Sequence, residues 1–174
     1  MKSTALALFA SCVVLGACGS DPLPPPSAPP PAPLQPEPPP SEKPGDDPRV
    51  SNINIAEDIK KACGITDAEA FFAYDSANVR EPDRAVLKKL ADCFSNGPLK
   101  GRQMRLVGHA DPRGDEEYNR VLGQRRADNV KAGISSQGLD SAKIATTSRG
   151  EDDATGTDES TWNRDRRVDI LLGD

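Results

Sequence analysis

The stretch "GHADPRGDEEYNRVLGQRRA", residues 108–127, contains the pattern from which the fold of this chain can be argued. Just before it, apolar and polar residues alternate over 104–108, which predicts a β-strand. Pro112 and Gly114 predict a turn, and from Glu116 the apolar residues recur every three or four positions, as on one face of a helix. A strand, a short loop and a long helix are therefore expected to follow one another here.

The same kind of pattern predicts the other elements of one domain over residues 49–174. We expect strands at 70–74, 104–108, 143–148 and 167–172, and helices at 55–62, 82–96, 116–137 and 158–163. Strands and helices thus alternate along the chain in the order β-α-β-α-β-(α)-β. This order predicts an α+β sandwich, in which helices pack on one face of a mixed four-stranded sheet.

Charged residues of opposite sign lie in the loop and on the helix of the strand-loop-helix unit. Asp111 lies in the loop, while Asn119, Leu122 and Arg126 are spaced by three and four residues on the helix and share one face. We expect Asp111 and Arg126 to border one pocket beside the helix N-terminus, which itself favours anions. A suitable ligand is a zwitterion, with an ammonium group for Asp111 and a carboxylate for Arg126. The free end of a meso-diaminopimelate side chain carries both groups on one carbon.

Asp111 and Arg126 could also serve a structural or a catalytic role. A structural salt bridge between Asp111 and Arg126, with no ligand, remains open. An enzyme is not expected, because hydrolysis needs paired acid and base groups, an activated nucleophile or a metal, and the chain has one histidine. Asp115 lies near Asp111, but Arg126 would keep Asp111 ionised and unsuited to proton transfer. No cofactor is predicted.

The N-terminus of the chain predicts export. Residues 1–17 combine a basic start, a short apolar run and small residues, which is typical of a secretory signal peptide, and the run is too short for a retained transmembrane helix. The ending "LGAC", residues 15–18, resembles a bacterial lipobox, in which the signal is cut before an acylated cysteine, here Cys18. An ordinary signal peptide is the alternative. Gly19 is not the aspartate that retains lipoproteins in the inner membrane, so we expect the periplasmic face of the outer membrane.

A proline-rich segment follows the lipobox and separates it from the domain. Between residues 22 and 48 lie 14 of the 17 prolines. Such a composition buries no core and favours an extended polyproline II conformation, which at about 3.1 Å per residue reaches about 80 Å. We interpret residues 18–48 as the lipidated N-terminus and a disordered tether.

Cys63 and Cys93 remain once Cys12 is removed with the signal peptide and Cys18 is acylated. In an oxidising compartment these two cysteines are expected to form one disulfide, with two buried free thiols as the alternative. No metal site is predicted, because zinc requires four ligands and the chain has a single histidine.

The stretch "GHADPRGDEEYNRVLGQRRADNV", residues 108–130, resembles the core motif of the OmpA-like peptidoglycan-binding domain, most of all in the lipoprotein members of that family. The family has a glycine, often His-Thr/Ala-Asp, then RG, EYN, LG and RRA at this spacing. "FFAYDSANV" at 71–79 resembles the family's FxFDSA strand end, and "DRRVDI" at 165–170 its closing NRRV strand. The resemblance covers nearly the whole domain and implies the OmpA-like fold.

The resemblance also implies a set of site residues. It assigns diaminopimelate to Asp111 and Arg126, in agreement with the charge pattern. It places further residues around them, the last two as weaker candidates: Asn119, Leu122, Asp75, Ser76, His109 and Arg166. Asp165 stands where the family has an asparagine, which would add a negative charge near the site.

The lipobox, tether and domain together predict an outer-membrane lipoprotein that binds peptidoglycan non-covalently and ties the outer membrane to the cell wall. The alternative is a protein-interaction module of a Tol-like or other envelope machine. Peptidoglycan and the outer membrane are the expected partners, and a Tol-system protein remains an open alternative. Nucleic acid is not expected, because the formal net charge is −5 and basic residues do not cluster with aromatic ones.

Overall fold

The computed structural model describes residues 50–75 and 80–173 of the chain. Within them lie five strands: β1 (Val50–Ile55), β2 (Phe71–Asp75), β3 (Met104–His109), β4 (Ile144–Gly150) and β5 (Arg167–Leu172). The helices are α1 (Glu57–Cys63), α2 (Asp67–Ala70), α3 (Glu81–Ser95), α4 (Glu116–Ser136) and α5 (Glu159–Asp165), with a 3₁₀ turn at Ser141–Lys143. The predicted signal peptide, Cys18, the tether and Ser76 lie outside the described residues.

The strands form one mixed sheet in the order β2-β1-β5-β3-β4. β1 pairs with β2 antiparallel and with β5 parallel, while β3 pairs with β5 antiparallel and with β4 parallel. The mixed sheet was predicted, but with four strands, and β1 is the strand that the prediction missed. Ile53 and Ile55 are buried there and alternate with half-buried Asn52 and Asn54. Asparagine is depleted in strands, which is why this short alternation was not recognised.

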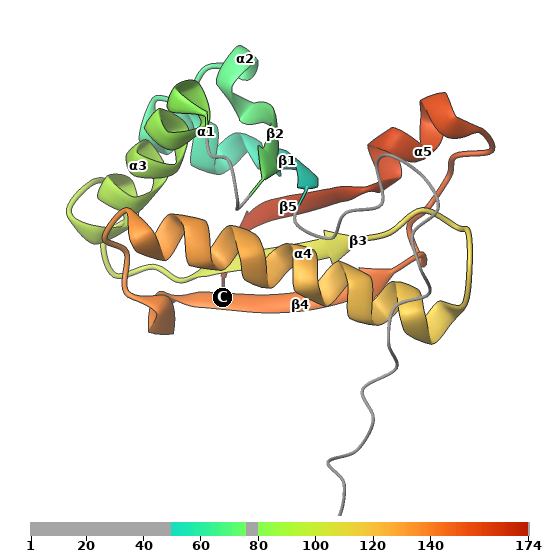
Figure 1. The fold of residues 1–174 in the computed structure, drawn as a ribbon. Helices are drawn as coiled ribbons and strands as arrows, with labels where there is room; N and C mark the ends of the chain where they lie inside the picture. The colour runs from blue at the N-terminus through green and yellow to red at the C-terminus, as the bar shows by residue number, and fades with distance from the viewer. Residues whose placement is uncertain (1–49, 76–79, 174) are drawn as a thin grey trace, which may run out of the picture. The chain divides into compact units, whose positions relative to one another are not determined.

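The helix α4 lies across β3 and β4 (Figure 1), and glycines allow it to approach them closely. A Cβ atom on Gly108 of β3 would overlap the carbonyl oxygen of Gly123 in α4. A Cβ atom on Gly123 would in turn overlap the hydroxyl of Ser148 in β4. Gly108 and Gly123, two of the three glycines of the 108–127 motif, are therefore positions where backbones touch.

The apolar core lies between the sheet and the helices α3 and α4. Every residue whose spacing predicted α3 is buried: Val86, Leu87, Leu90 and Phe94. On α4 the burial is uneven, with Leu122, Ala127, Val130 and Ile134 buried and Tyr118 and Val121 half-buried. The other face of the sheet carries polar side chains, including Asn54, Arg105, Arg167 and Asp169. The predicted arrangement of helices on one face is thus confirmed.

A disulfide joins Cys63, the last residue of α1, to Cys93 in α3, which confirms the predicted bond. The two cysteines are 30 residues apart in the sequence. The bond therefore fixes the first helix of the domain to the core helix α3.

Replacing both cysteines, Cys63→Ala with Cys93→Ala, is expected to lower the free energy of unfolding by about 2–4 kcal/mol, because the cross-link restricts the unfolded chain. Urea denaturation of the oxidised protein and the variant measures this difference. A reducing agent should bring the wild type to the stability of the variant and leave the variant unchanged. Equal stability of oxidised wild type and variant would contradict the expectation.

Gly108→Ala is expected to lower the free energy of unfolding by about 1–3 kcal/mol, because the new methyl group meets backbone that cannot rotate away. Gly123→Ala should cost less, since its nearest clash is with the Ser148 hydroxyl. Alanine also gains about 1 kcal/mol over glycine inside a helix. Urea denaturation of the two variants tests the order, and a larger loss for Gly123→Ala would refute the argument.

Candidate ligand-binding site

The strand directions bring the predicted site residues to one edge of the sheet. β3 ends where the antiparallel β5 begins, and β2 ends at the same edge because it runs antiparallel to β1. Asp75 ends β2, Asp111 follows β3 and Arg166 directly precedes β5. Neighbouring strands lie about 4.8 Å apart, so the ends of β2 and β3, three steps apart, are separated by about 14 Å.

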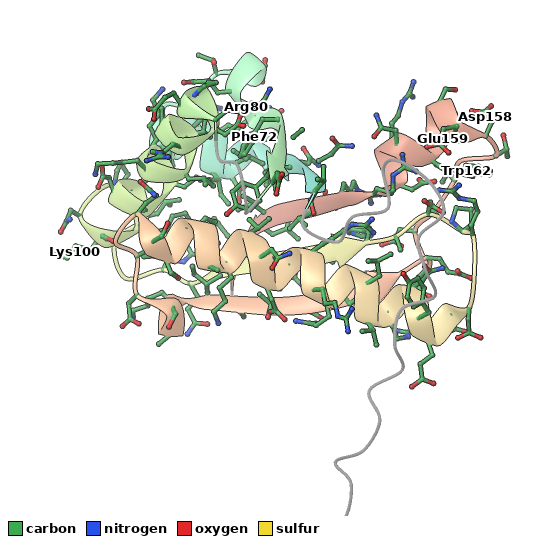
Figure 2. All side chains as sticks on the ribbon, in the orientation of Figure 1. Phe72, Arg80, Lys100, Asp158, Glu159 and Trp162 are labelled. Carbon is green, nitrogen blue, oxygen red and sulfur yellow. A yellow bond between two sulfur atoms is a disulfide. The ribbon has the colours of Figure 1, made fainter. Side chains whose placement is uncertain are left out.

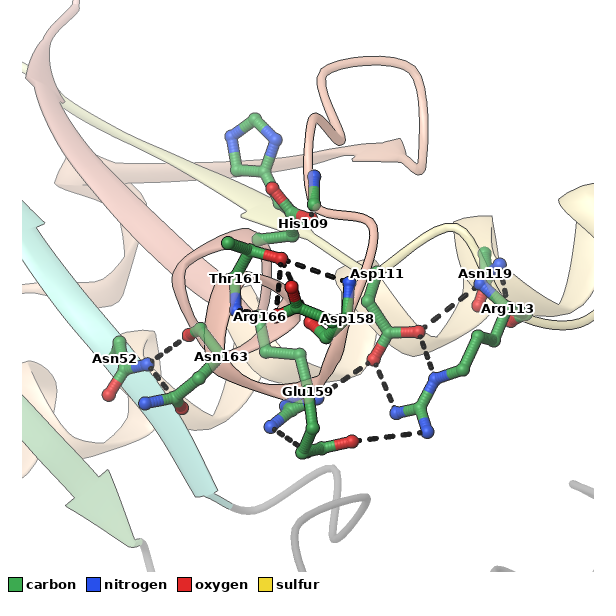
Figure 3. A network of polar contacts seen from close by, with 12 residues as sticks. Asn52, His109, Asp111, Arg113, Asn119, Asp158, Glu159, Thr161, Asn163 and Arg166 are labelled. Carbon is green, nitrogen blue, oxygen red and sulfur yellow. Dashed lines mark hydrogen bonds and ion pairs between the residues drawn. The ribbon is translucent and has the colours of Figure 1, made fainter.

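Four residues at this edge form a closed ring of alternating charge, which we call the charge ring: Asp111, Arg113, Glu159 and Arg166 (Figure 3). Nε and Nη2 of Arg113 donate to the two carboxylate oxygens of Asp111, each at 2.9 Å. Nη1 of Arg166 donates to Oδ2 of Asp111 at 3.1 Å. Both arginines also meet Glu159, with Nη2 of Arg166 at 2.8 Å and Nη1 of Arg113 at 3.4 Å from its carboxylate oxygens.

The two acids of the charge ring differ in their exposure. The Asp111 side chain is 7% exposed and that of Glu159 is 58% exposed. Burial raises the pKa of the Asp111 carboxyl, but hydrogen bonds from Arg113 and Arg166 outweigh it and hold the pKa below its ordinary value. Asp111 is therefore a buried carboxylate that keeps its charge at neutral pH.

The helix α5 supplies Glu159 and also covers Arg113. The guanidinium carbon of Arg113 lies 4.3 Å from the ring centroid of Trp162, within the range of a cation–π contact. Asp158 and Thr161 form a capping box that fixes the start of α5. Figure 2 shows Glu159 and Trp162 together on this short helix. The sequence analysis did not identify Arg113, Glu159 or Trp162, because their contacts join parts of the chain that are far apart.

Arg126 lies beneath the loop that carries Asp111. Its side chain is fully buried, and its Nη1 donates to the carbonyl oxygen of His109 at 3.2 Å. Asp111 forms its ion pairs with Arg113 and Arg166. Arg126 thus supports the backbone next to Asp111.

Asn119 and Leu122 are also buried beside this loop. Nδ2 of Asn119 donates to the carbonyl oxygen of Arg113 at 3.0 Å and also to the carboxylate of Glu151. Asn119 therefore fixes the turn between β3 and α4 and links it to the segment that follows β4.

His109 points away from the charge ring in Figure 3. Its Nε2 lies 3.1 Å from Oδ2 of Asp169, and its Nδ1 lies 3.5 Å from Oδ2 of Asp153. Burial raises the pKa of Asp169, but the bond with His109 and the charge of Arg167 lower it more, so it lies below its ordinary value. The structure therefore brings His109 into a separate polar cluster, whereas Arg166, the other weaker candidate, is a member of the ring.

Asp165, which stands where the family has an asparagine, is buried. Its two carboxylate oxygens accept hydrogen bonds from the backbone nitrogens of Thr155 and Gly156, at 3.1 and 2.9 Å. The carboxylate is therefore used to hold the loop before α5.

A hollow of about 730 Å³ lies beside α5. Residues from β1, β2, β5 and the α5 region line it, among them Asn52, Phe72, Asn163, Arg164 and Arg167. Nδ2 of Asn52 donates to Oδ1 of Asn163 at 3.1 Å across one side. The sequence analysis missed this hollow because it missed β1.

Within residues 50–75 and 80–173, none of the helices is both long enough and apolar enough to cross a membrane. In the same residues, no group of three or more histidine, cysteine or acidic side chains is placed to hold a metal ion.

The mixed sheet, the helix across β3 and β4, and the charged site at the strand ends define an α+β domain of the OmpA type. A family model described as the OmpA family matches residues 71–168, and the chain belongs to this family. The resemblance predicted from residues 108–130 is thereby confirmed.

Named relatives show the same similarity. The chain is 38% identical over 103 residues to the peptidoglycan-associated lipoprotein of Pseudomonas putida, which covers 58% of this chain and 60% of the relative. It is 45% identical over 100 residues to that of Haemophilus influenzae, which covers 56% of this chain and 64% of the relative. The match to the first of these relatives thus spans about three-fifths of its length.

A solved structure is also similar to this chain. The crystal structure of the peptidoglycan-associated lipoprotein from Burkholderia pseudomallei superposes with a TM-score of 0.50 at 34% sequence identity. The match covers 59% of this chain and 86% of that one.

Asp111→Asn is expected to lower the free energy of unfolding by about 1–3 kcal/mol at neutral pH, because two arginines lose a charged acceptor. Since the folded pKa lies below the ordinary 3.8, the carboxylate stabilises the fold above pH 3.8, and this contribution is lost as the pH falls through the folded value. Thermal unfolding as a function of pH should show the wild type and the variant converge in acid. Asp128→Asn, at an exposed residue of α4, is the control, and a gap that persists in acid for Asp111→Asn would contradict the assignment.

Proposed function

We propose that this protein binds peptidoglycan non-covalently at the charge ring. The observation that carries the proposal is Asp111, a carboxylate that is almost fully buried yet held ionised between Arg113 and Arg166 at the edge of the sheet. Membership of the OmpA family and similarity to proteins named peptidoglycan-associated lipoprotein support it. Catalysis is not part of the proposal, because a carboxylate fixed by two arginines is a poor proton donor or acceptor.

The ligand in this proposal is the free end of a diaminopimelate residue in the stem peptide. Its ammonium group binds Asp111 and its carboxylate binds arginine, as paired donors and acceptors of opposite charge require. Arg126, the carboxylate partner predicted from the sequence, forms the floor beneath the loop. Because it is fully buried, it reaches a ligand only if that loop shifts.

The walls of the site follow from the same proposal. Asn119 and Leu122 line it on the α4 side, and Asp75 lines it on the β2 side. The resemblance assigns Ser76 to the same side, but Ser76 lies outside the described residues. The distance of about 14 Å between the ends of β2 and β3 leaves room for a peptide between the two sides.

We further propose that the chain is an outer-membrane lipoprotein that ties this membrane to the cell wall from its periplasmic face. Residues 1–17 are the proposed signal peptide, Cys18 the acylated residue and residues 18–48 the tether. Two or three acyl chains, at about 0.8 kcal/mol for each buried methylene, anchor a protein stably where one chain does not.

Co-sedimentation with purified diaminopimelate-type peptidoglycan tests the binding proposal. The wild type is expected in the pellet, and Asp111→Ala should raise the dissociation constant at least about tenfold, because a charged hydrogen bond contributes about 1.5–3 kcal/mol. Arg126→Ala should also reduce binding, with circular dichroism used to establish that this variant is folded.

Arg125→Ala is the matched control, since Arg125 is the half-buried neighbour of Arg126 on α4 and lies outside the charge ring. It should sediment like the wild type. A wild type that stays in the supernatant would refute the proposal, and an Asp111→Ala variant that pellets normally would place the site elsewhere.

A further inference from the structure

Glu159 is the most exposed member of the charge ring, and both of its carboxylate oxygens face arginine. Oε1 accepts from Nη2 of Arg166 at 2.8 Å, and Oε2 lies 3.4 Å from Nη1 of Arg113. Asp111, in contrast, is nearly buried and uses other nitrogen atoms of the same two arginines. The ring therefore has a fixed inner carboxylate and an outer one in contact with solvent.

Each arginine divides its donors between the two acids. Arg166 donates from Nη1 to Asp111 and from Nη2 to Glu159. Arg113 donates from Nε and Nη2 to Asp111, and its Nη1 forms the ion pair with Glu159. The donors that face outward are thus Nη2 of Arg166 and Nη1 of Arg113. A carboxylate arriving from solvent would need these same two donors, which Glu159 occupies.

We propose that Glu159 holds the carboxylate position of this site in the ligand-free protein, and that the carboxylate of a ligand displaces it to bind between Arg113 and Arg166. This inference rests on the proposed function and deepens it. It adds Arg113 to the residues that recognise the ligand and gives Arg166, already a candidate, a defined role. It also makes Glu159 a residue that sets the affinity without touching the bound ligand.

The surroundings of Glu159 favour such an exchange. The Glu159 carboxylate is 58% exposed, so water and salt screen its attraction to the two arginines. Arg166 is only 8% exposed, and a ligand carboxylate that takes the place of Glu159 keeps it paired. Glu159 is the first residue of α5, and the capping box of Asp158 and Thr161 holds this helix end without it. Trp162 stays stacked on Arg113 and keeps that guanidinium in place when Glu159 leaves.

Calorimetric titration of the purified protein with a soluble diaminopimelate-containing muropeptide tests the inference. Glu159→Gln removes the negative charge at nearly constant shape, and it should bind this probe about three- to tenfold more tightly than the wild type, as expected when an exposed ion pair no longer competes. A lysine-type muropeptide, whose side chain ends in an amine without a carboxylate, should show no gain.

Glu116→Gln is the matched control, because Glu116 is also the first residue of a helix, is 67% exposed and pairs with Arg120, outside the ring. It removes the same charge from the protein and should bind like the wild type. Trp162 is the one tryptophan in the sequence, so its fluorescence provides a second readout of changes around Arg113.

The outcomes separate the two proposals. If the wild type binds the diaminopimelate probe and Glu159→Gln binds it equally or more weakly, Glu159 is not a competitor, and this inference is overturned while the proposed function stands. A gain shared by Glu116→Gln or by the lysine-type probe also overturns it. If neither the wild type nor Glu159→Gln binds the diaminopimelate probe, the proposed function fails and this inference fails with it.

Discussion

Because glycine stands at both position 108 and position 123, the backbone of β3 can touch the backbone of α4. This contact sets the depth at which α4 packs on the sheet, and the site depends on that depth. Arg126, one turn further along α4, is thereby brought within hydrogen-bonding distance of the carbonyl of His109. The loop from β3 to α4 is held from below by Arg126 and from the side by Asn119, so Asp111 has a fixed position at the edge of the sheet.

The charge ring, the proposed site for a charged ligand, is compatible with a stable ligand-free domain. Two acids and two bases neutralise one another, so each charge of the ring has a partner of opposite sign. In the proposed exchange, a ligand carboxylate takes the place of Glu159 between the two arginines, and the ligand's ammonium group adds a contact with Asp111. A simple anion would make only the first of these contacts, and this difference is a basis for selecting zwitterions.

Local patterns predicted most of the fold and part of the site. The helical spacing of α3 and α4, the turn at Pro112 and Gly114, and the position of Asp111 after a strand all depend on residues close in sequence. Whether a residue on the inner face of a helix is at the rim or fully buried depends on how deeply the helix packs. The periodicity correctly placed Arg126 on the inner face of α4, but it could not show that the guanidinium of Arg126 is buried. The contacts of Arg113 with Glu159 and Trp162 join the β3–α4 loop to α5, and no local pattern signals them.

Burial of Asp111 and Arg166 is not explained by stability alone. Removing two charges from water costs free energy that their attraction returns only in part, and well-packed apolar residues often do as well. What a buried pair does provide is a carboxylate and a guanidinium whose positions are fixed before a ligand arrives, which lowers the ordering cost of binding. Glu159 is the exposed member that leaves in the proposed exchange, while Trp162 keeps the half-buried Arg113 in place. The ring thus has a buried inner half, Asp111 and Arg166, and an exposed outer carboxylate, Glu159, and this division agrees with the proposed exchange of Glu159 for a ligand carboxylate.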